Sequence, residues 1–331
     1  MTKSKILFLS VICALLIVTS CQKEEVSVNE AKVLVEYMEG SSNPLGKHYA
    51  STDMPSLISA TELNSLNLLD QAYIIDIRSS ADFGNGHIEN AVQVDPANLL
   101  SHMETADLSG IEKIAIVCYS GQTAAWATTL LRIMGYGNVF SLKFGMASWN
   151  DNFATPWVNA TENGNTYAAF FETTNHPKAE AGELPELNTG GKTGEEILES
   201  RMAAVLAEGF NPVKITAQTV FTNPDDYYIV CYWPASHYSD PGHIPGAIQY
   251  TPKESIKFST DLLTLPTDKP IVIYCYTGQG SAFLSAYLRL LGYDAKSLLY
   301  GANGMAYDMV VSSNLSKFSS ADIMDYNYVT N

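Results

Sequence analysis

The chain has 331 residues, of which 19 are basic and 35 are acidic, so its formal net charge is −16 at pH 7. Such an acidic surface repels nucleic acid and anionic lipid headgroups, which excludes both as charge-driven partners. Only three cysteines, Cys118, Cys231 and Cys275, lie beyond residue 21. They are too few for a disulfide framework, and the length of the chain favours two domains.

The N-terminal segment has the features of a lipoprotein signal. Two lysines precede an apolar run at residues 6–18, which is too short to span a bilayer comfortably, and small residues then lead into Cys21 in the stretch VTSC. This stretch resembles the lipobox of bacterial lipoproteins, which implies cleavage before Cys21 and a lipid on its thiol. We therefore expect a signal peptide at 1–20, a tether at 21–30 and an extracytoplasmic protein. Its lipid would be its only membrane contact, at the periplasmic or surface face of the outer membrane. An ordinary secretory signal with an incidental Cys21 is the alternative.

The rest of the chain contains an internal repeat. The stretch NGHIENAVQV is matched by PGHIPGAIQY, IAIVCYSGQTAAW by IVIYCYTGQGSAF, and LLRIMGYGNVFSLKFG by YLRLLGYDAKSLLYG, in the same order and at similar spacing. This pattern indicates a duplicated domain, with copies at 31–157 and 195–331. The segment 158–194 between them is rich in Asn, Gly, Thr, Pro and Glu, which is typical of a linker.

Each copy alternates strands with a helix. The first copy has, in order, a β-rich run, a second short strand, an apolar strand, a helical pattern and a last strand, at residues 72–77, 91–94, 114–117, 124–134 and 138–142. The second copy repeats this order at residues 227–232, 247–250, 271–274, 281–291 and 296–300. The alternation predicts an α/β fold in which each copy is a parallel sheet with helices on both faces.

Both apolar strands end at a cysteine, Cys118 or Cys275, and a short polar loop with a glycine follows before the helix. In this geometry the N–H groups of the loop and of the first helical turn point toward the sulfur, and so does the positive end of the helix dipole. These groups lower the pKa of a thiol and stabilise an anion on the sulfur. We therefore expect both cysteines to be thiolates near neutral pH.

The two copies resemble rhodanese domains, the sulfurtransferase fold, over about 57–152 and 215–308. The resemblance rests on DIR, on GHIENA and GHIPGA, on the two cysteine loops and on FGMASW. It implies that a loop cysteine takes sulfane sulfur from a small donor, becomes a persulfide and passes the sulfur to a thiol or another nucleophile. We expect no cofactor and no metal. The residues that this resemblance assigns to the two sites are Cys118, Tyr119, Ser120, Gly121, Gln122 and Thr123 in the first copy, and Cys275, Tyr276, Thr277, Gly278, Gln279 and Gly280 in the second.

The two copies differ at the end of the β-rich run. Asp76 and Arg78 of DIR are expected to form a local pair that braces the first loop, whereas the second copy has Cys231 and Trp233 at these positions. Adjacent parallel strands are about 4.8 Å apart. If the register is level, Cys231 could therefore act as a resolving thiol for Cys275. The alternative is that Cys231 only fills the end of a strand.

Neither cysteine loop contains an arginine or a lysine. This absence predicts weak affinity for doubly charged thiosulfate and favours a polysulfide or an organic persulfide as donor. Two other functions remain open. The domains could be a non-catalytic binding or sulfur-sensing surface module. Phosphatase or arsenate reductase chemistry would need an arginine that closes the loop on an oxyanion, and neither copy has one.

Overall fold

The computed structural model describes residues 29–331, so the predicted signal peptide and Cys21 lie outside the described residues. It contains two sheets of five parallel strands, in the orders β1-β5-β4-β2-β3 and β6-β10-β9-β7-β8. The prediction of two tandem α/β domains with parallel sheets is thereby confirmed. The strands are β1 (Leu57–Ile58), β2 (Ala72–Asp76), β3 (Val92–Gln93), β4 (Lys113–Val117) and β5 (Val139–Leu142) in the first domain, and β6 (Lys214–Ile215), β7 (Tyr228–Cys231), β8 (Ile248–Gln249), β9 (Ile271–Tyr274) and β10 (Ala295–Leu298) in the second.

The central strands are almost continuously apolar because both faces of each sheet are covered. β4 reads KIAIV and β9 reads IVIY, and all four residues of β9 are buried. β4 lies between β5 and β2, and β9 lies between β10 and β7. The connection after β2 leads to β3 on one side of the sheet, and the connection after β4 leads to β5 on the other side; the second sheet repeats this reversal at β7 and β9. Cys118 and Cys275 are the first residues after the carboxyl ends of β4 and β9.

The helix after each cysteine begins earlier than the sequence pattern predicted. α6 spans Gln122–Ile133 and α12 spans Gln279–Leu290, against expected starts at 124 and 281. The preceding Gly121 and Gly278 have φ values of 80° and 77°, in the left-handed region that favours glycine. This turn is tight enough for the glutamine directly after each glycine to be helical already.

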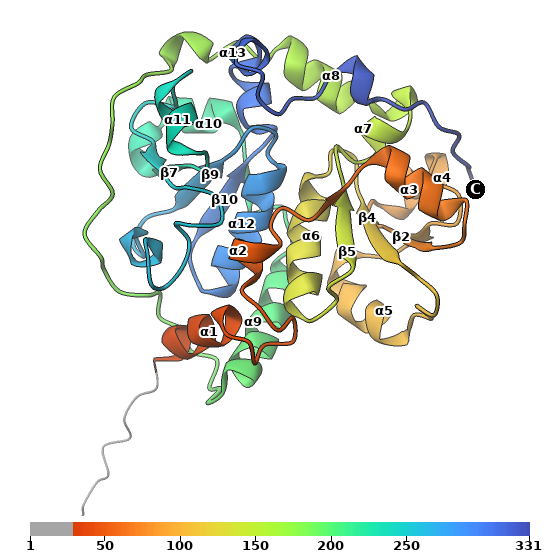
Figure 1. Cartoon of the computed structure of the whole chain (residues 1–331), viewed down its shortest axis with the longest axis horizontal. Helices are drawn as coiled ribbons and strands as arrows, with labels where there is room; N and C mark the ends of the chain where they lie inside the picture. Colours follow the sequence, from red (N-terminus) through yellow and green to blue (C-terminus); the bar gives the residue numbers. More distant parts are fainter. Residues whose placement is uncertain (1–28) are drawn as a thin grey trace, which may run out of the picture.

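The two domains share one core. The inner faces of both sheets, α6, α12, α1 and α9 form a single cluster of buried apolar side chains. Figure 1 shows α6 and α12 side by side between the two sheets. The other helices are α1 (Glu30–Glu39), α2 (Tyr49–Thr52), α3 (Ala60–Asn67), α4 (Ser80–Asn85), α5 (Leu99–Thr105), α7 (Met146–Trp149), α8 (Thr155–Glu162), α9 (Gly194–Glu208), α10 (Ala217–Thr222), α11 (Ala235–Ser239) and α13 (Tyr307–Ser312). No helix among residues 29–331 is both long and apolar enough to cross a membrane.

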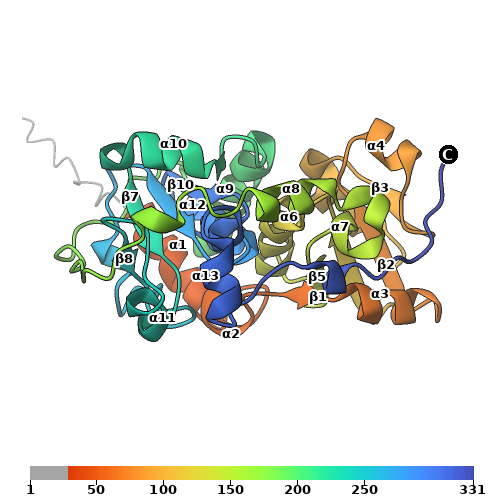
Figure 2. The same cartoon turned by 90° about the horizontal axis from the view of Figure 1, so that it is seen from above.

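Each domain is also contacted by the segment that follows the other domain. The C-terminal segment crosses to the first domain (Figures 1 and 2). There, the Trp149 indole N–H donates to the carbonyl of Asn327 at 2.8 Å. Its Val329 forms a β-bridge with His87. In the same way, Glu172 of the segment after α8 forms a β-bridge with His243 of the second domain. The two histidines of the repeated GHI motif are therefore matched anchor points for two different segments.

Candidate active site

The sulfur of Cys118 lies against the start of α6. The backbone N–H of Ala124 donates to Sγ at 3.3 Å, and the N–H groups of Ser120 and Gly121 also face the sulfur. The side chain is buried, with a relative exposure of 5%. The structure therefore forms the ring of amides that the sequence predicted around this sulfur.

Cys275 accepts the corresponding first-turn bond in the second domain. The backbone N–H of Ser281 donates to Sγ at 3.3 Å, and the residue is 6% exposed. The Ser281 hydroxyl lies 3.9 Å from Sγ, whereas Ala124 in the first domain has no polar side chain there. The second sulfur therefore has a hydroxyl neighbour that the first lacks.

Burial has a larger effect on Cys118 than the amides do. It raises the pKa of the thiol above its ordinary value, although hydrogen bonds from Ala124, Ser120 and Gly121 act to lower this pKa. The expectation of a Cys118 thiolate near neutral pH is therefore not supported. The sequence pattern showed the donors around the sulfur but not how completely the fold removes it from water.

The raised pKa of Cys118 leads to a pH prediction. In a Cys275→Ser variant, only the thiolate of Cys118 can attack a sulfur donor. The rate of persulfide formation should therefore rise about tenfold per pH unit up to about pH 9. The rate of persulfide formation is measured by stopped flow or by mass spectrometry of quenched samples. The rate of a variant that lacks both cysteines is subtracted. A rate that is flat above about pH 7 would contradict this prediction.

Asp76 and Arg78 lie together beside the first loop. The Arg78 guanidinium donates to Asp76 Oδ2 at 2.6 Å, and both side chains are buried. The guanidinium also lies 4.9 Å from the ring centre of Tyr119, whose hydroxyl donates to Asp82. Because Asp76 neutralises Arg78, this pair braces the loop without supplying a free positive charge to a donor.

The second loop is braced by stacking instead of by an ion pair. Trp233 stacks on the ring of Tyr276 with centroids 4.9 Å apart and an interplanar angle of 17°. The Tyr276 hydroxyl is hydrogen-bonded to His237, which occupies the place that Asp82 has in the first domain. Cys231 and Trp233 thus replace an ion pair by an apolar contact.

The register places Cys231 away from Cys275. Cys231 is paired with Tyr274, so Cys275 lies one residue further along the neighbouring strand. Side chains alternate between the two faces of a strand. Accordingly, Cys231 packs with Trp233 and Tyr274 on the outer face of the sheet, and both cysteines are free thiols. The level register that the resolving role requires is absent, so the geometry does not support this role.

The comparisons with known proteins agree with this geometry. The family model of the rhodanese-like domain matches residues 59–152 and 225–306, which is one match in each domain and together just over half of the chain. The chain belongs to the rhodanese-like family. The expected resemblance in fold is thereby confirmed.

Sequence relatives of the rhodanese-like domains are sulfurtransferases. The thiosulfate sulfurtransferase GlpE of Shewanella oneidensis is 30% identical over 94 residues, which are 28% of this chain and 91% of that protein. The GlpE of Stutzerimonas stutzeri is 32% identical over 82 residues, which are 25% of this chain and 73% of that protein. Among solved structures, the 3-mercaptopyruvate sulfotransferase SseA of Escherichia coli is 19% identical with a TM-score of 0.27, covering 75% of this chain and 98% of that chain.

The two rhodanese-like domains are joined through their loops. Gln122 and Gln279, assigned from sequence to the substrate loops, are buried and cross the domain interface. Gln122 Oε1 accepts the backbone N–H of Tyr300 at 2.8 Å, and Gln279 Oε1 accepts that of Phe144 at 3.3 Å. These oxygens therefore bind the opposite domain. The repeated glutamine after the loop glycine was the one sequence signal for this contact.

The two loops also differ in the side chains that lie near the sulfur. A Cβ atom on Gly280 would lie 3.2 Å from Cys275 Sγ, and Thr123 has a side chain at the matching position of the first domain. The Ser120 carbonyl accepts the indole N–H of Trp157 at 3.1 Å, and Thr277 is buried. The second rhodanese-like loop therefore lacks a side chain at the position that Thr123 occupies in the first.

Proposed function

We propose that both domains are sulfurtransferases that move sulfane sulfur through a persulfide on Cys118 or Cys275. The observation that carries this proposal is the pair of matched sulfurs, each of which accepts a hydrogen bond from a first-turn backbone N–H at 3.3 Å. Amide donors held in a buried site stabilise negative charge on a terminal sulfur without any cost of reorganisation. A small thiol or another nucleophile would be the acceptor.

The chemistry consists of two displacements. The cysteine thiolate attacks the outer sulfur of the donor, a sulfur–sulfur bond forms, and the sulfur–sulfur bond of the donor breaks. The leaving group is sulfite when thiosulfate is the donor, a shortened polysulfide when polysulfide is the donor, and an organic thiolate when an organic persulfide is the donor. The acceptor thiolate then attacks the outer sulfur of the persulfide, and the cysteine leaves as a thiolate. Neither displacement requires an oxidant, a cofactor or a metal.

The charge around the loops sets the expected donor. Neither loop has a cationic side chain, and Arg78 is paired with Asp76. We therefore expect polysulfide or an organic persulfide to be used with a higher kcat/KM than thiosulfate, although the sequence relatives are named for thiosulfate. The experiment measures kcat/KM for each donor on the purified protein, and intact mass should show added sulfur before an acceptor is supplied. A preference for thiosulfate would contradict the charge argument. Absence of added sulfur with every donor would contradict the proposed function.

The burial of both sulfurs favours one second candidate, a non-catalytic module that stores or senses sulfur. Such a module would take up sulfane sulfur but would release it slowly to thiols. A single-turnover assay distinguishes the two functions, because a sulfurtransferase loses the added sulfur to excess thiol on the timescale of steady-state turnover.

We further propose that the mature protein begins at Cys21 and is anchored to the outer membrane by lipid on this thiol. Support comes from the short apolar run at 6–18 and from VTSC. Mass spectrometry of the membrane fraction should find an acylated Cys21 at the N-terminus, and Cys21→Ser should release the protein from the membrane. An unmodified wild-type protein outside the membrane fraction would contradict this prediction.

A further inference from the structure

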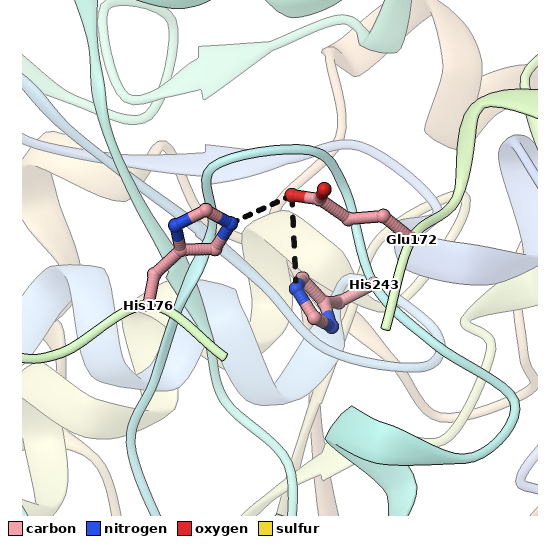
Figure 3. Close-up of side chains that lie close together, drawn as sticks. All are labelled: Glu172, His176 and His243. Carbon is pink, nitrogen blue, oxygen red and sulfur yellow. Dashed lines mark hydrogen bonds and ion pairs between the residues drawn. The ribbon is translucent and has the colours of Figure 1, made fainter. Parts of the chain in front are cut away.

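A cluster of two histidines and one carboxylate lies where the segment after the first domain crosses the second domain. Glu172 Oε1 is 2.7 Å from His176 Nε2 and 3.9 Å from His243 Nε2. Figure 3 shows the carboxylate between the two imidazole rings. One donor atom of each residue lies within 4.8 Å of the others. The cluster is separate from both cysteine loops.

The hydrogen bonds of His243 fix which of its nitrogens carries a proton. Its Nδ1 lies 2.7 Å from the carbonyl oxygen of Tyr238, and a carbonyl only accepts, so Nδ1 is the N–H donor. In the neutral ring with this tautomer, the lone pair is on Nε2.

This lone pair faces another electron-rich group. His243 is fully buried, and among the described residues its Nε2 has no hydrogen-bond partner. The Glu172 carboxylate oxygen Oε1, which accepts the backbone N–H of Gly246 at 2.7 Å, lies 3.9 Å from this Nε2. Two acceptors that face each other are stabilised by a cation between them.

The equivalent place in the first domain is an internal comparison. His87 makes the same bond from Nδ1, 2.8 Å from the carbonyl of Phe83, and its backbone forms the same kind of β-bridge. The bridging residue there is Val329, which has no donor atom in its side chain. The GHI histidine and its bridge are therefore common features of both domains, whereas the bridging linker segment places a carboxylate and a second histidine beside His243.

We propose that Glu172, His176 and His243 bind a divalent transition metal, with Zn²⁺ the best match. Two imidazoles and one carboxylate are an established zinc ligand set, and a ligating histidine usually donates its other N–H to a carbonyl, as His243 does. In a tetrahedral zinc site the donor atoms are about 3.3 Å apart. The distance of 2.7 Å between Glu172 and His176 must therefore increase slightly, and the distance of 3.9 Å between Glu172 and His243 must decrease. Glu172 and His176 have side chains that are 29% and 32% exposed, so they can move, and water can take the fourth position.

The metal would attach the linker to the second domain. Glu172 and His176 belong to the linker, and His243 belongs to the second sheet domain, so one ion would join segments that are 67 or more residues apart in sequence. None of the three residues belongs to a cysteine loop, so the metal would take no part in sulfur transfer. Its expected effect is protection of the linker near residue 172 from proteolysis, with the persulfide reaction unchanged.

The test uses zinc and cobalt with the complete chain. Equilibrium dialysis with Zn²⁺ should find one saturable site in the wild type, and Co²⁺ should give the visible absorption of a tetrahedral N/O complex. Glu172→Gln keeps the size of the side chain and its acceptor for Gly246, and His176→Ala changes a partly exposed ring. Both variants should bind Zn²⁺ at least about tenfold more weakly.

His102→Ala is the matched control, because this partly exposed histidine lies in the first domain and its Nε2 is hydrogen-bonded to the Tyr73 hydroxyl. It should bind Zn²⁺ as the wild type does. Circular dichroism of each variant confirms folding before dialysis. No saturable zinc in the wild type, or equal affinity in the wild type and in the Glu172→Gln and His176→Ala variants, would overturn the proposal.

Discussion

Replacing Cys118 and Cys275 together by serine is expected to reduce sulfur transfer to the uncatalysed rate. Serine can still accept the backbone N–H bonds that Ala124 and Ser281 donate, so the loops should keep their shape. An alkoxide is far less accessible than a thiolate at neutral pH, and no persulfide can form on oxygen. The loss should exceed about 100-fold in kcat/KM, with far-ultraviolet circular dichroism unchanged.

The single variants separate the two sites. Cys118→Ser should leave the activity of the second domain, and Cys275→Ser that of the first. The control is Cys231→Ala, whose sulfur lies on the other face of the sheet and should not affect transfer. Transfer that survives in the double serine variant would exclude persulfide chemistry on these loops. A large loss in Cys231→Ala would restore the resolving role.

The second large effect is expected for Gly145→Ala, because this glycine closes the first cysteine loop. The backbone N–H of Met146 donates to the carbonyl of Cys118 at 2.8 Å, which brings the chain at Gly145 against the loop. A Cβ atom there would lie 2.3 Å from that carbonyl oxygen, and the φ value of 63° is unfavourable for alanine. We expect a loss of at least about 2 kcal/mol in the free energy of unfolding and loss of transfer through Cys118.

Gly84→Ala is the matched control for this variant. Gly84 lies in α4, and its added Cβ atom would meet nothing within 4 Å. Alanine is favoured over glycine in a helix by up to about 1 kcal/mol, so this variant should be as stable as the wild type or slightly more stable. Urea unfolding and Cys118-dependent transfer in a Cys275→Ser background measure both effects. An unchanged Gly145→Ala protein would show that the loop can move away from the turn.

Much of the fold could be predicted because the repeat supplies two independent copies of each pattern. Apolar runs that lead to Cys118 and Cys275, with a glycine three residues later, indicate a buried parallel strand, a loop and a helix. The predicted helix starts were two residues late, since a left-handed glycine starts the helix sooner than apolar periodicity can show. Local sequence therefore predicted the type and order of the elements better than their ends.

The sequence by itself determined the duplicated α/β fold, the cysteine at the end of each central strand and the absence of cationic side chains from both loops, because these features depend only on local pattern. Tertiary structure alone decided the rest. A shift of one residue in register placed Cys231 on the opposite face from Cys275, and burial raised the pKa of Cys118. Packing of α6 on α12 turned Gln122 and Gln279 toward the opposite domain. Register, desolvation and domain contacts all depend on residues distant in the chain, and no local pattern contains them.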